Sequence, residues 1–222
     1  MNRNAAPDDT VEADEPPLVV IVEDDAAVRS ALSSLLRSVG YRVDAYEAPA
    51  ALLQKGVPKS AGCLVLDVRL PMIGGLDLQK RLAELNDRVP VVFMTGHGDI
   101  PMSVQAMKAG AIDFLSKPFR DQDMLDAVAA AIARDRARRT AEAGLTELQK
   151  RLESLSRRER EVMALATAGL LNKQIAAEVG LSEVTVKIHR GRAMHKMGAR
   201  SFADLVRMAE SLGVRPDRSA SR

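Results

Sequence analysis

Four apolar runs of this 222-residue sequence each end in residues that could take part in phosphoryl transfer. The residues at these ends are Glu23-Asp24-Asp25, Asp67, Thr95 and Lys117. Clustered carboxylates repel one another unless a cation compensates them, and Mg²⁺ takes carboxylates, waters and a phosphate oxygen as ligands. A carboxylate can also act as a nucleophile and form an aspartyl-phosphate. If the fold gathers the four ends, these residue types suit a metal-assisted phosphoryl acceptor.

Thr95 and Lys117 would complete such a site. Thr95 could donate a hydrogen bond to one phosphoryl oxygen, and Lys117 could neutralise another. The simpler interpretation is that an Asp or Thr at a strand end only caps the next helix, and a single instance would be read that way. Four matching ends in the right order favour the functional interpretation.

The elements that must position these residues alternate along the chain from Leu18. Continuous apolar runs predict strands, and apolar residues at helical spacing predict helices. The predicted strands are 18–22, 41–46, 63–66, 91–94 and 112–115, and the predicted helices are 26–39, 48–55, 76–85, 101–109 and a last one from residue 121 onward. This alternation implies an α/β domain with a parallel, doubly wound sheet. Such sheets bind ligands at the carboxyl ends of their strands. Glu23-Asp24-Asp25, Asp67, Thr95 and Lys117 are expected at these ends.

Residues 18–133 resemble the receiver domain of two-component response regulators over the whole length of that domain. The matching motifs are VEDD (22–25), LDVRLP (66–71) with GG (74–75), MTG (94–96) and AGAIDFLSKPF (109–119). The resemblance implies a five-stranded parallel sheet of order 2-1-3-4-5, as in flavodoxin-like and CheY-like folds. It also implies that the domain accepts a phosphoryl group from a sensor histidine kinase, with Mg²⁺ as the cofactor.

The same resemblance implies roles for individual residues. Asp67 is expected to be the phosphoacceptor, and Thr95 and Lys117 are expected to sense the phosphoryl group. The ligands expected for Mg²⁺ are the side chains of Glu23, Asp24 and Asp67 and the backbone carbonyl of Arg69. Many relatives have Asp where this chain has Glu23, and we expect metal binding to survive the change. A cis peptide bond is expected between Lys117 and Pro118.

Phe114 has two compatible interpretations. It is expected to be a core aromatic of a strand, or, by the resemblance, a switch residue that repositions together with Thr95. A side chain that rotates between two positions needs a buried place to occupy, so one interpretation does not exclude the other.

Charge divides the chain into an acidic and a basic part. Residues 1–133 carry 13 Lys/Arg against 19 Asp/Glu, whereas residues 134–222 carry 19 Lys/Arg against 11 Asp/Glu. A basic segment favours a polyanionic partner. The sequence has no apolar run near the roughly 18 residues of a membrane-spanning helix and no signal pattern, so we expect a cytoplasmic protein without a membrane partner. The single cysteine excludes an internal disulfide and a cysteine-rich zinc site.

The basic part is expected to be all-helical. Ser156 and Glu159 form a capping-box pattern at the start of a first helix. The helices that follow are expected over 173–179 with Asn172 as cap, over 183–197 with Ser182 as cap, and from Ser201 onward. Two helices separated by a short turn that contains Gly180 indicate a helix-turn-helix, whose recognition helix would enter the major groove.

Residues 155–212 resemble the LuxR-type DNA-binding domain. The matching motifs are LSRREREV (155–162), GLLNKQIA (169–176) and LSEVTVKIHR (181–190). The resemblance implies that Lys187, Ile188 and Arg190 face bases. It also implies that Lys173 and Thr185 hold DNA phosphates, which would set the register without reading sequence. Helical spacing predicts an inward face formed by Val186, His189, Ala193 and Met197.

These patterns predict five segments. They are a disordered N-terminal tail (1–17), the receiver domain (18–133), a helical linker (134–154), the LuxR-type helix-turn-helix domain (155–213) and a flexible tail (214–222). The linker is charged and poor in turn signals. A coiled-coil seam is the alternative for it, although the apolar spacing is too short to support one.

The two domains together resemble the FixJ/NarL type of transcriptional response regulator, and MTGHGDIPM (94–102) resembles the FixJ branch. The expected function is phosphorylation-dependent DNA binding and transcription regulation, not enzymatic turnover. Phosphorylation is expected to shift Thr95 and Phe114 and to promote homodimerisation. Two helix-turn-helices would then bind paired promoter half-sites as one unit, with RNA polymerase as a further partner.

Two other functions would use some of the same residues. A phosphatase of the haloacid-dehalogenase class also uses an aspartyl-phosphate and Mg²⁺, but it requires a second Asp two residues after the nucleophile, where this chain has Arg69. It would usually also need a cap domain, for which the chain has no room. A constitutive DNA-binding protein would use the receiver only as a dimerisation scaffold, and an incomplete acidic pocket would favour that alternative. The four strand ends of this chain are complete.

Overall fold

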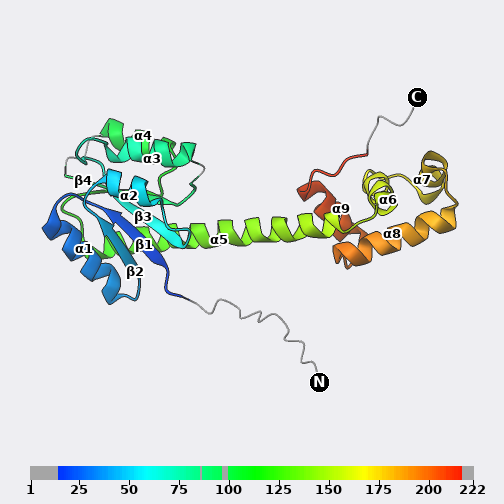
Figure 1. The fold of residues 1–222 in the computed structure, drawn as a ribbon, viewed down its shortest axis with the longest axis horizontal. Coiled ribbons are helices and arrows are strands. Elements are labelled where there is room, and N and C mark those ends of the chain that lie inside the picture. Colours follow the sequence, from blue (N-terminus) through cyan, green and yellow to red (C-terminus); the bar gives the residue numbers. More distant parts are fainter. Residues whose placement is uncertain (1–14, 86, 97–99, 217–222) are drawn as a thin grey trace, which may run out of the picture. The chain divides into compact units, whose positions relative to one another are not determined.

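The computed structural model describes residues 15–85, 87–96 and 100–216. The chain divides into two compact units, Met1–Arg138 and Arg139–Arg222 (Figure 1). The FixJ-like stretch 94–102 lies partly outside the described residues. Among the helices of the described residues, none combines the length and apolar character of a transmembrane segment.

The first unit is built on a five-stranded parallel sheet of order β2-β1-β3-β4-β5, which confirms the predicted order. The strands are β1 (Leu18–Val22), β2 (Arg42–Tyr46), β3 (Ala61–Asp67), β4 (Val91–Thr95) and β5 (Asp113–Ser116). β3 is longer at both ends than the predicted run 63–66, because Ala61 pairs with Leu18 of β1 and Asp67 pairs with Met94 of β4. β1, β3 and β4 are buried on both faces, as their continuous apolar runs indicate.

Five helices cover the two faces of this sheet. They are α1 (Ala26–Ser38), α2 (Pro49–Lys55), α3 (Gly75–Glu84), α4 (Ile100–Lys108) and α5 (Asp121–Glu153). Alternate residues of β1 point to opposite faces, since strand side chains alternate. Val20 joins the core cluster that includes residues of α2, α3 and α4, whereas Ile21 joins the cluster that includes residues of α1 and α5. Figure 1 shows α2, α3 and α4 together over one face of the sheet.

α5 is one helix of 33 residues. The predicted linker, residues 134–154, therefore forms the second part of this helix up to Glu153, and Gly144 does not interrupt it. Leu152 and Leu155, at the end of this stretch, are buried in the core of the second unit.

The second unit contains α6 (Arg157–Thr167), α7 (Asn172–Val179), α8 (Glu183–Met197) and α9 (Phe202–Ser211). The predicted capping box is confirmed, because the Ser156 hydroxyl accepts from the Glu159 backbone N–H and the Glu159 carboxylate accepts from the Ser156 backbone N–H. The prediction that Asn172 caps α7 is wrong. α7 begins at Asn172 with Leu171 as its N-cap, and Gln174 Oε1 accepts the Leu171 N–H at 2.8 Å. A glutamine at the third helical position reaches back to a backbone N–H that the helix leaves unsatisfied.

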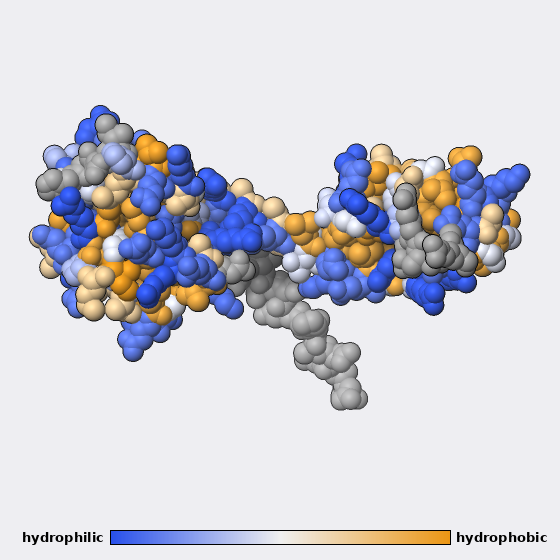
Figure 2. Space-filling model, turned by 90° about the horizontal axis from the view of Figure 1, so that it is seen from above, coloured by the Kyte–Doolittle hydropathy of each residue, from blue (hydrophilic) through white to orange (hydrophobic). Residues whose placement is uncertain are grey.

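The face of the molecule seen in Figure 2 mixes blue hydrophilic and orange apolar side chains over both units. Several large apolar residues are exposed on the second unit, with 70% exposure for Leu171 and Val184 and 48% for Ile188. Val184 and Ile188 lie on α8, the helix that would recognise DNA.

Candidate functional site

Three carboxylates meet at the carboxyl ends of β1 and β3. The two strands are neighbours, and their register pairs Val22 with Leu66, so the next residues, Glu23 and Asp67, lie side by side. One oxygen from each of Glu23, Asp24 and Asp67 lies within 4.8 Å of the others. Glu23 and Asp67 are buried and Asp24 is exposed. The structure thus brings together the three acidic side chains that were predicted to hold a metal.

Lys117 bridges the two buried carboxylates. Its Nζ donates to Glu23 Oε2 and to Asp67 Oδ2, each at 2.6 Å. It reaches them from the turn after β5, where Lys117 and Pro118 are joined by a cis peptide bond. Burial raises the pKa of the Glu23 carboxyl, against the opposing effect of Lys117. Burial alone would lower the pKa of the Lys117 ammonium, but its hydrogen bonds to Asp67 and Glu23 outweigh burial and raise that pKa.

The three acidic residues after β1 have different roles. Glu23 and Asp24 belong to the acidic cluster, whereas Asp25 is the N-cap of α1. Asp25 caps α1, with Oδ1 accepting from the backbone N–H groups of Ala27 at 2.8 Å and Val28 at 3.0 Å. These bonds hold the pKa of the Asp25 carboxyl below its ordinary value. The Asp25 carboxylate is therefore engaged in the cap, as the simpler interpretation of a strand-end Asp expects.

Arg29 fixes the same turn, a contact that the sequence did not predict. Its Nη1 donates to the backbone carbonyl of Glu23 at 2.7 Å and to that of Asp24 at 3.0 Å. A guanidinium that holds two successive carbonyls restricts the backbone from which both acidic side chains extend. In the sequence, only the position of Arg29, one turn into the helix after the acidic pair, indicates this contact. An arginine on the protein surface that makes no such contact could occupy the same position.

Asp67 is held at both oxygens. Oδ1 accepts the backbone N–H of Arg69 at 2.8 Å, and Oδ2 accepts from Lys117. The Arg69 side chain itself is exposed. Gly75, at the start of α3, packs so closely on this segment that a β-carbon there would lie 2.3 Å from the Asp67 carbonyl oxygen. The role of the Arg69 carbonyl as a metal ligand remains a prediction.

Thr95 and Phe114 lie on β4 and β5, the two strands that follow β3 in the order of the sheet. Thr95 ends β4 and is fully buried, and its carbonyl accepts the Lys117 backbone N–H at 2.7 Å. Phe114 is half-buried on β5 and packs against the core, with its ring centroid 6.4 Å from that of Phe93. These contacts support the prediction that Phe114 is a core aromatic, whereas its role as a switch residue stays a prediction.

The second unit holds the residues that were predicted to contact DNA. Gly180 ends α7 in the left-handed conformation, and Ser182 caps α8 by accepting the Thr185 N–H. Lys173, Lys187 and Ile188 are exposed, and Thr185 is half-buried with its hydroxyl 2.8 Å from that of Ser182. On the opposite side of α8 the residues Val186, Ala193 and Met197 are fully buried, whereas His189 is only half-buried.

Arg190 differs from the other predicted DNA contacts because it is held within its own unit. Its guanidinium carbon lies 4.2 Å from the centre of the Phe202 ring, and Nη1 donates to Asn172 Oδ1 at 3.4 Å. The side chain thereby connects α8 to α7 and α9. These contacts describe an intramolecular brace, and the base contact expected for Arg190 stays a prediction.

Two family descriptions match this chain. Residues 19–129 match "Response regulator receiver domain", and residues 153–209 match "Bacterial regulatory proteins, luxR family". Nodulation protein W of Bradyrhizobium diazoefficiens is 56% identical over 203 residues, which cover 91% of this chain and 89% of that protein. The transcriptional regulatory protein FixJ of Azorhizobium caulinodans is 46% identical over 198 residues, which cover 89% of this chain and 94% of that protein.

A solved structure is similar over both units. The low-resolution structure of the response regulator StyR has a TM-score of 0.78 and 46% sequence identity, and the match covers 88% of this chain and 99% of that one. The chain therefore belongs to the two-component response regulators that combine a receiver domain with a LuxR-type helix-turn-helix, a family of phosphorylation-dependent transcription regulators and not of enzymes.

Proposed function

We propose that Asp67 accepts a phosphoryl group from a sensor histidine kinase and that this modification controls DNA binding by the second unit. The observation that carries the proposal is the cluster of Glu23, Asp24 and Asp67, compensated by Lys117. In the transfer, an Asp67 carboxylate oxygen forms a bond to phosphorus while the bond from phosphorus to the donor histidine nitrogen breaks. The nitrogen leaves with the electron pair.

The donor set fits Mg²⁺, which prefers carboxylate oxygens and keeps several waters. Glu23, Asp24 and Asp67 would hold it, together with the Arg69 carbonyl. When bound, the ion would neutralise negative charge on the transferring group. Lys117 supplies only one positive charge to the three carboxylates, so a divalent cation is compatible with the charge that remains.

Lys117 and Thr95 are proposed to act on the modified Asp67. Lys117 would exchange a carboxylate oxygen for a phosphoryl oxygen, and Thr95 would donate its hydroxyl to another. Thr95 lies at the end of β4, and its carbonyl accepts a hydrogen bond from the Lys117 N–H. A movement of Thr95 would therefore also displace the backbone that follows β5. Phe114 on β5 would change position with it.

The output is proposed to be promoter binding as a homodimer in the cytoplasm, with RNA polymerase as a further partner. Lys173 and Thr185 would contact phosphates, and Lys187, Ile188 and Arg190 would face bases. Dimerisation would make two weak DNA contacts act as one strong contact. Because phosphate contacts release counterions, affinity for DNA would fall steeply as salt rises.

The test uses the full chain with acetyl phosphate as the phosphoryl donor. Labelling is expected to need Mg²⁺ and to disappear in Asp67→Asn, and DNA affinity is expected to rise only in the labelled protein. Asp77→Asn, an exposed carboxylate on α3, is the matched control and should label normally. Labelling of Asp67→Asn to the wild-type extent would exclude Asp67 as the acceptor.

A further inference from the structure

A cavity lies in the first unit at the amino ends of β4 and β5, whereas Asp67 lies at the carboxyl end of β3. It has a volume of about 600 Å³, which is within the range of pockets that bind small molecules. Its lining comes from α3, from the segments before β4 and β5, and from α5 up to Arg138. All of these residues belong to one unit. Neither the acidic cluster nor the helix-turn-helix contributes to it.

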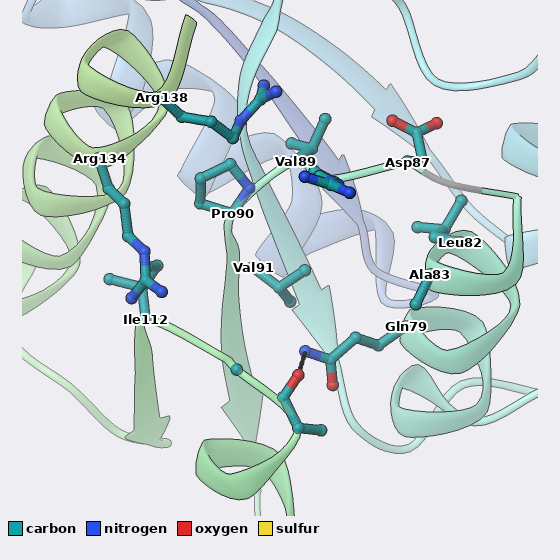
Figure 3. Close-up of a pocket in the computed structure, with 13 residues that line it drawn as sticks. Gln79, Leu82, Ala83, Asp87, Val89, Pro90, Val91, Ile112, Arg134 and Arg138 are labelled. Atoms are coloured by element: carbon teal, nitrogen blue, oxygen red, sulfur yellow. Dashed lines mark hydrogen bonds between the residues drawn. The ribbon is translucent and has the colours of Figure 1, made fainter. Parts of the chain in front are cut away.

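Guanidinium groups and apolar side chains share this lining. Figure 3 shows Arg134 and Arg138 extending from α5 on one side of the cavity, across from Leu82 and Asp87, with Val89, Pro90 and Val91 between the two sides. A third guanidinium comes from Arg88. Such a combination suits a ligand with an anionic end and an apolar body, because guanidinium pairs with carboxylates in a planar, bidentate geometry.

The charges of the lining are only partly compensated. Arg138 pairs with Asp135 at 2.5 Å. The guanidinium groups of Arg88 and Arg134 form no hydrogen bond or ion pair with a residue that the structure describes. Asp87 is the acidic residue of the lining. The guanidinium groups of Arg88 and Arg134 are thus available to a ligand, and the Asp87 carboxylate offsets one of their two charges, so the lining matches an anion with a single charge.

Gln79 supplies an independent sign that a group is accommodated here. The residue is 8% exposed, and its Nε2 donates to the Ala109 carbonyl at 3.2 Å. Its Oε1 is buried and accepts no hydrogen bond from any residue that the structure describes. A buried acceptor left without a donor is unfavourable, because it has lost its water partners and gained none in the protein. In Figure 3 the Gln79 amide lies at one end of the cavity, where a water enclosed beside a bound ligand could donate to Oε1.

We propose that this cavity binds a small organic monocarboxylate, with its carboxylate paired to Arg134 and Arg88 and its apolar body against Leu82, Val89 and Ile112. The ligand would tie α5 to the segment that precedes β4. The site is distinct from the phosphoacceptor and does not depend on the proposed role of Asp67.

The test is calorimetric titration of the full chain with three probes, namely benzoate, inorganic phosphate and benzyl alcohol. Benzoate combines a carboxylate with an apolar ring, whereas phosphate has the charge without a ring and benzyl alcohol has the ring and a neutral hydroxyl without the charge. Saturable binding is expected for benzoate alone, and it should shift the methyl NMR signals of Leu82, Val89 and Ile112. Equal binding of phosphate, or no saturable binding of benzoate, would overturn the proposal.

Two variants separate the site from general attraction to a basic helix. Arg134→Ala is expected to weaken benzoate binding about tenfold, the loss of one charge-assisted pair. Arg136→Ala removes an exposed arginine of α5 that does not line the cavity and should bind benzoate as the wild type does. Equal weakening in both variants would show non-specific attraction and contradict the proposal. Both variants should accept phosphate from acetyl phosphate as the wild type does, because neither residue lies near Asp67.

Discussion

The Lys117 ammonium donates to the Asp67 carboxylate at 2.6 Å, and the same nitrogen lies 2.6 Å from Glu23. These two carboxylates are buried next to each other at the ends of neighbouring strands. Lys117 therefore has two functions to reconcile. It pairs with two neighbouring carboxylates in the unmodified protein, and under the proposed function it would contact a phosphoryl oxygen after transfer.

Replacing Lys117 by Met should separate these functions. Without the ammonium, Glu23 and Asp67 repel each other in a buried site, and we expect the first unit to lose about 2–3 kcal/mol of unfolding free energy. Saturating Mg²⁺ should recover most of this loss, because the ion replaces the missing positive charge. The measurement is urea denaturation with and without Mg²⁺, followed by the fluorescence of Tyr41 and Tyr46, the two tyrosines of the chain.

Lys80→Met is the control for this experiment. Lys80 lies on α3 with its side chain 58% exposed, and it pairs with Asp77 at 3.6 Å. Surface ion pairs of this kind contribute little to stability, so the unfolding free energy of Lys80→Met should be close to that of the wild type with and without Mg²⁺. An equal loss in both variants, or a Lys117→Met protein that Mg²⁺ does not stabilise, would contradict the view that Lys117 substitutes for a bound cation.

Gly75→Ala should destabilise the first unit although alanine is the better helix former. A β-carbon at Gly75 would lie 2.3 Å from the Asp67 carbonyl oxygen and 3.2 Å from Phe93 Cε1, so α3 or the segment after β3 must move. We expect a loss of about 1–3 kcal/mol and slower phosphorylation of Asp67. At Gly74 the nearest atom would be 3.4 Å away, and Gly74→Ala should be tolerated. Tyrosine fluorescence and acetyl-phosphate labelling of both variants check this, and equal stability of the two would refute the steric argument.

The sheet could be predicted from the sequence because its strands are buried on both faces and therefore appear as continuous apolar runs. The positions of Glu23, Asp67 and Lys117 followed from the same pattern, since parallel strands bring their carboxyl ends to one edge. The contact of Arg29 with two carbonyls could not be predicted, because it depends on the path of the turn after β1. The start of α7 was misplaced by one residue, because Asn172 and Gln174 are both able to cap and only the backbone geometry decides between them.

Arg190→Ala and Lys187→Ala should affect different properties. Arg190 stacks on the Phe202 ring and donates a hydrogen bond to Asn172. Its removal should lower the unfolding free energy of the second unit by about 1–2 kcal/mol. Lys187 is exposed and forms no ion pair with any residue that the structure describes, so its removal should leave stability unchanged and weaken DNA binding. Hydrogen–deuterium exchange of α6 to α9 measures the first effect, and DNA affinity at several salt concentrations measures the second. An Arg190→Ala protein of wild-type stability would favour a purely DNA-contacting role for this arginine.

Glu159 should make the second unit sensitive to acid. Its carboxylate accepts from Lys196 Nζ at 2.7 Å and from the Ser156 N–H at 2.8 Å. These bonds, that of Lys196 foremost, lower the pKa of Glu159 from 4.5 to about 2. Because the folded pKa is the lower one, the stabilisation is complete above pH 4.5 and is lost as the pH falls from there towards 2.

Glu159→Gln should therefore remove this part of the pH dependence. At neutral pH the variant should be less stable by roughly 1–2 kcal/mol, the usual cost of a lost helix cap, and the difference from wild type should shrink as the pH falls below 4.5. Hydrogen–deuterium exchange of α6 across this pH range measures the difference. Glu210→Gln, at an exposed position on α9, should follow the wild type at every pH. A Glu159→Gln protein whose stability falls with acid in parallel with the wild type would show that the Glu159–Lys196 pair does not stabilise the domain.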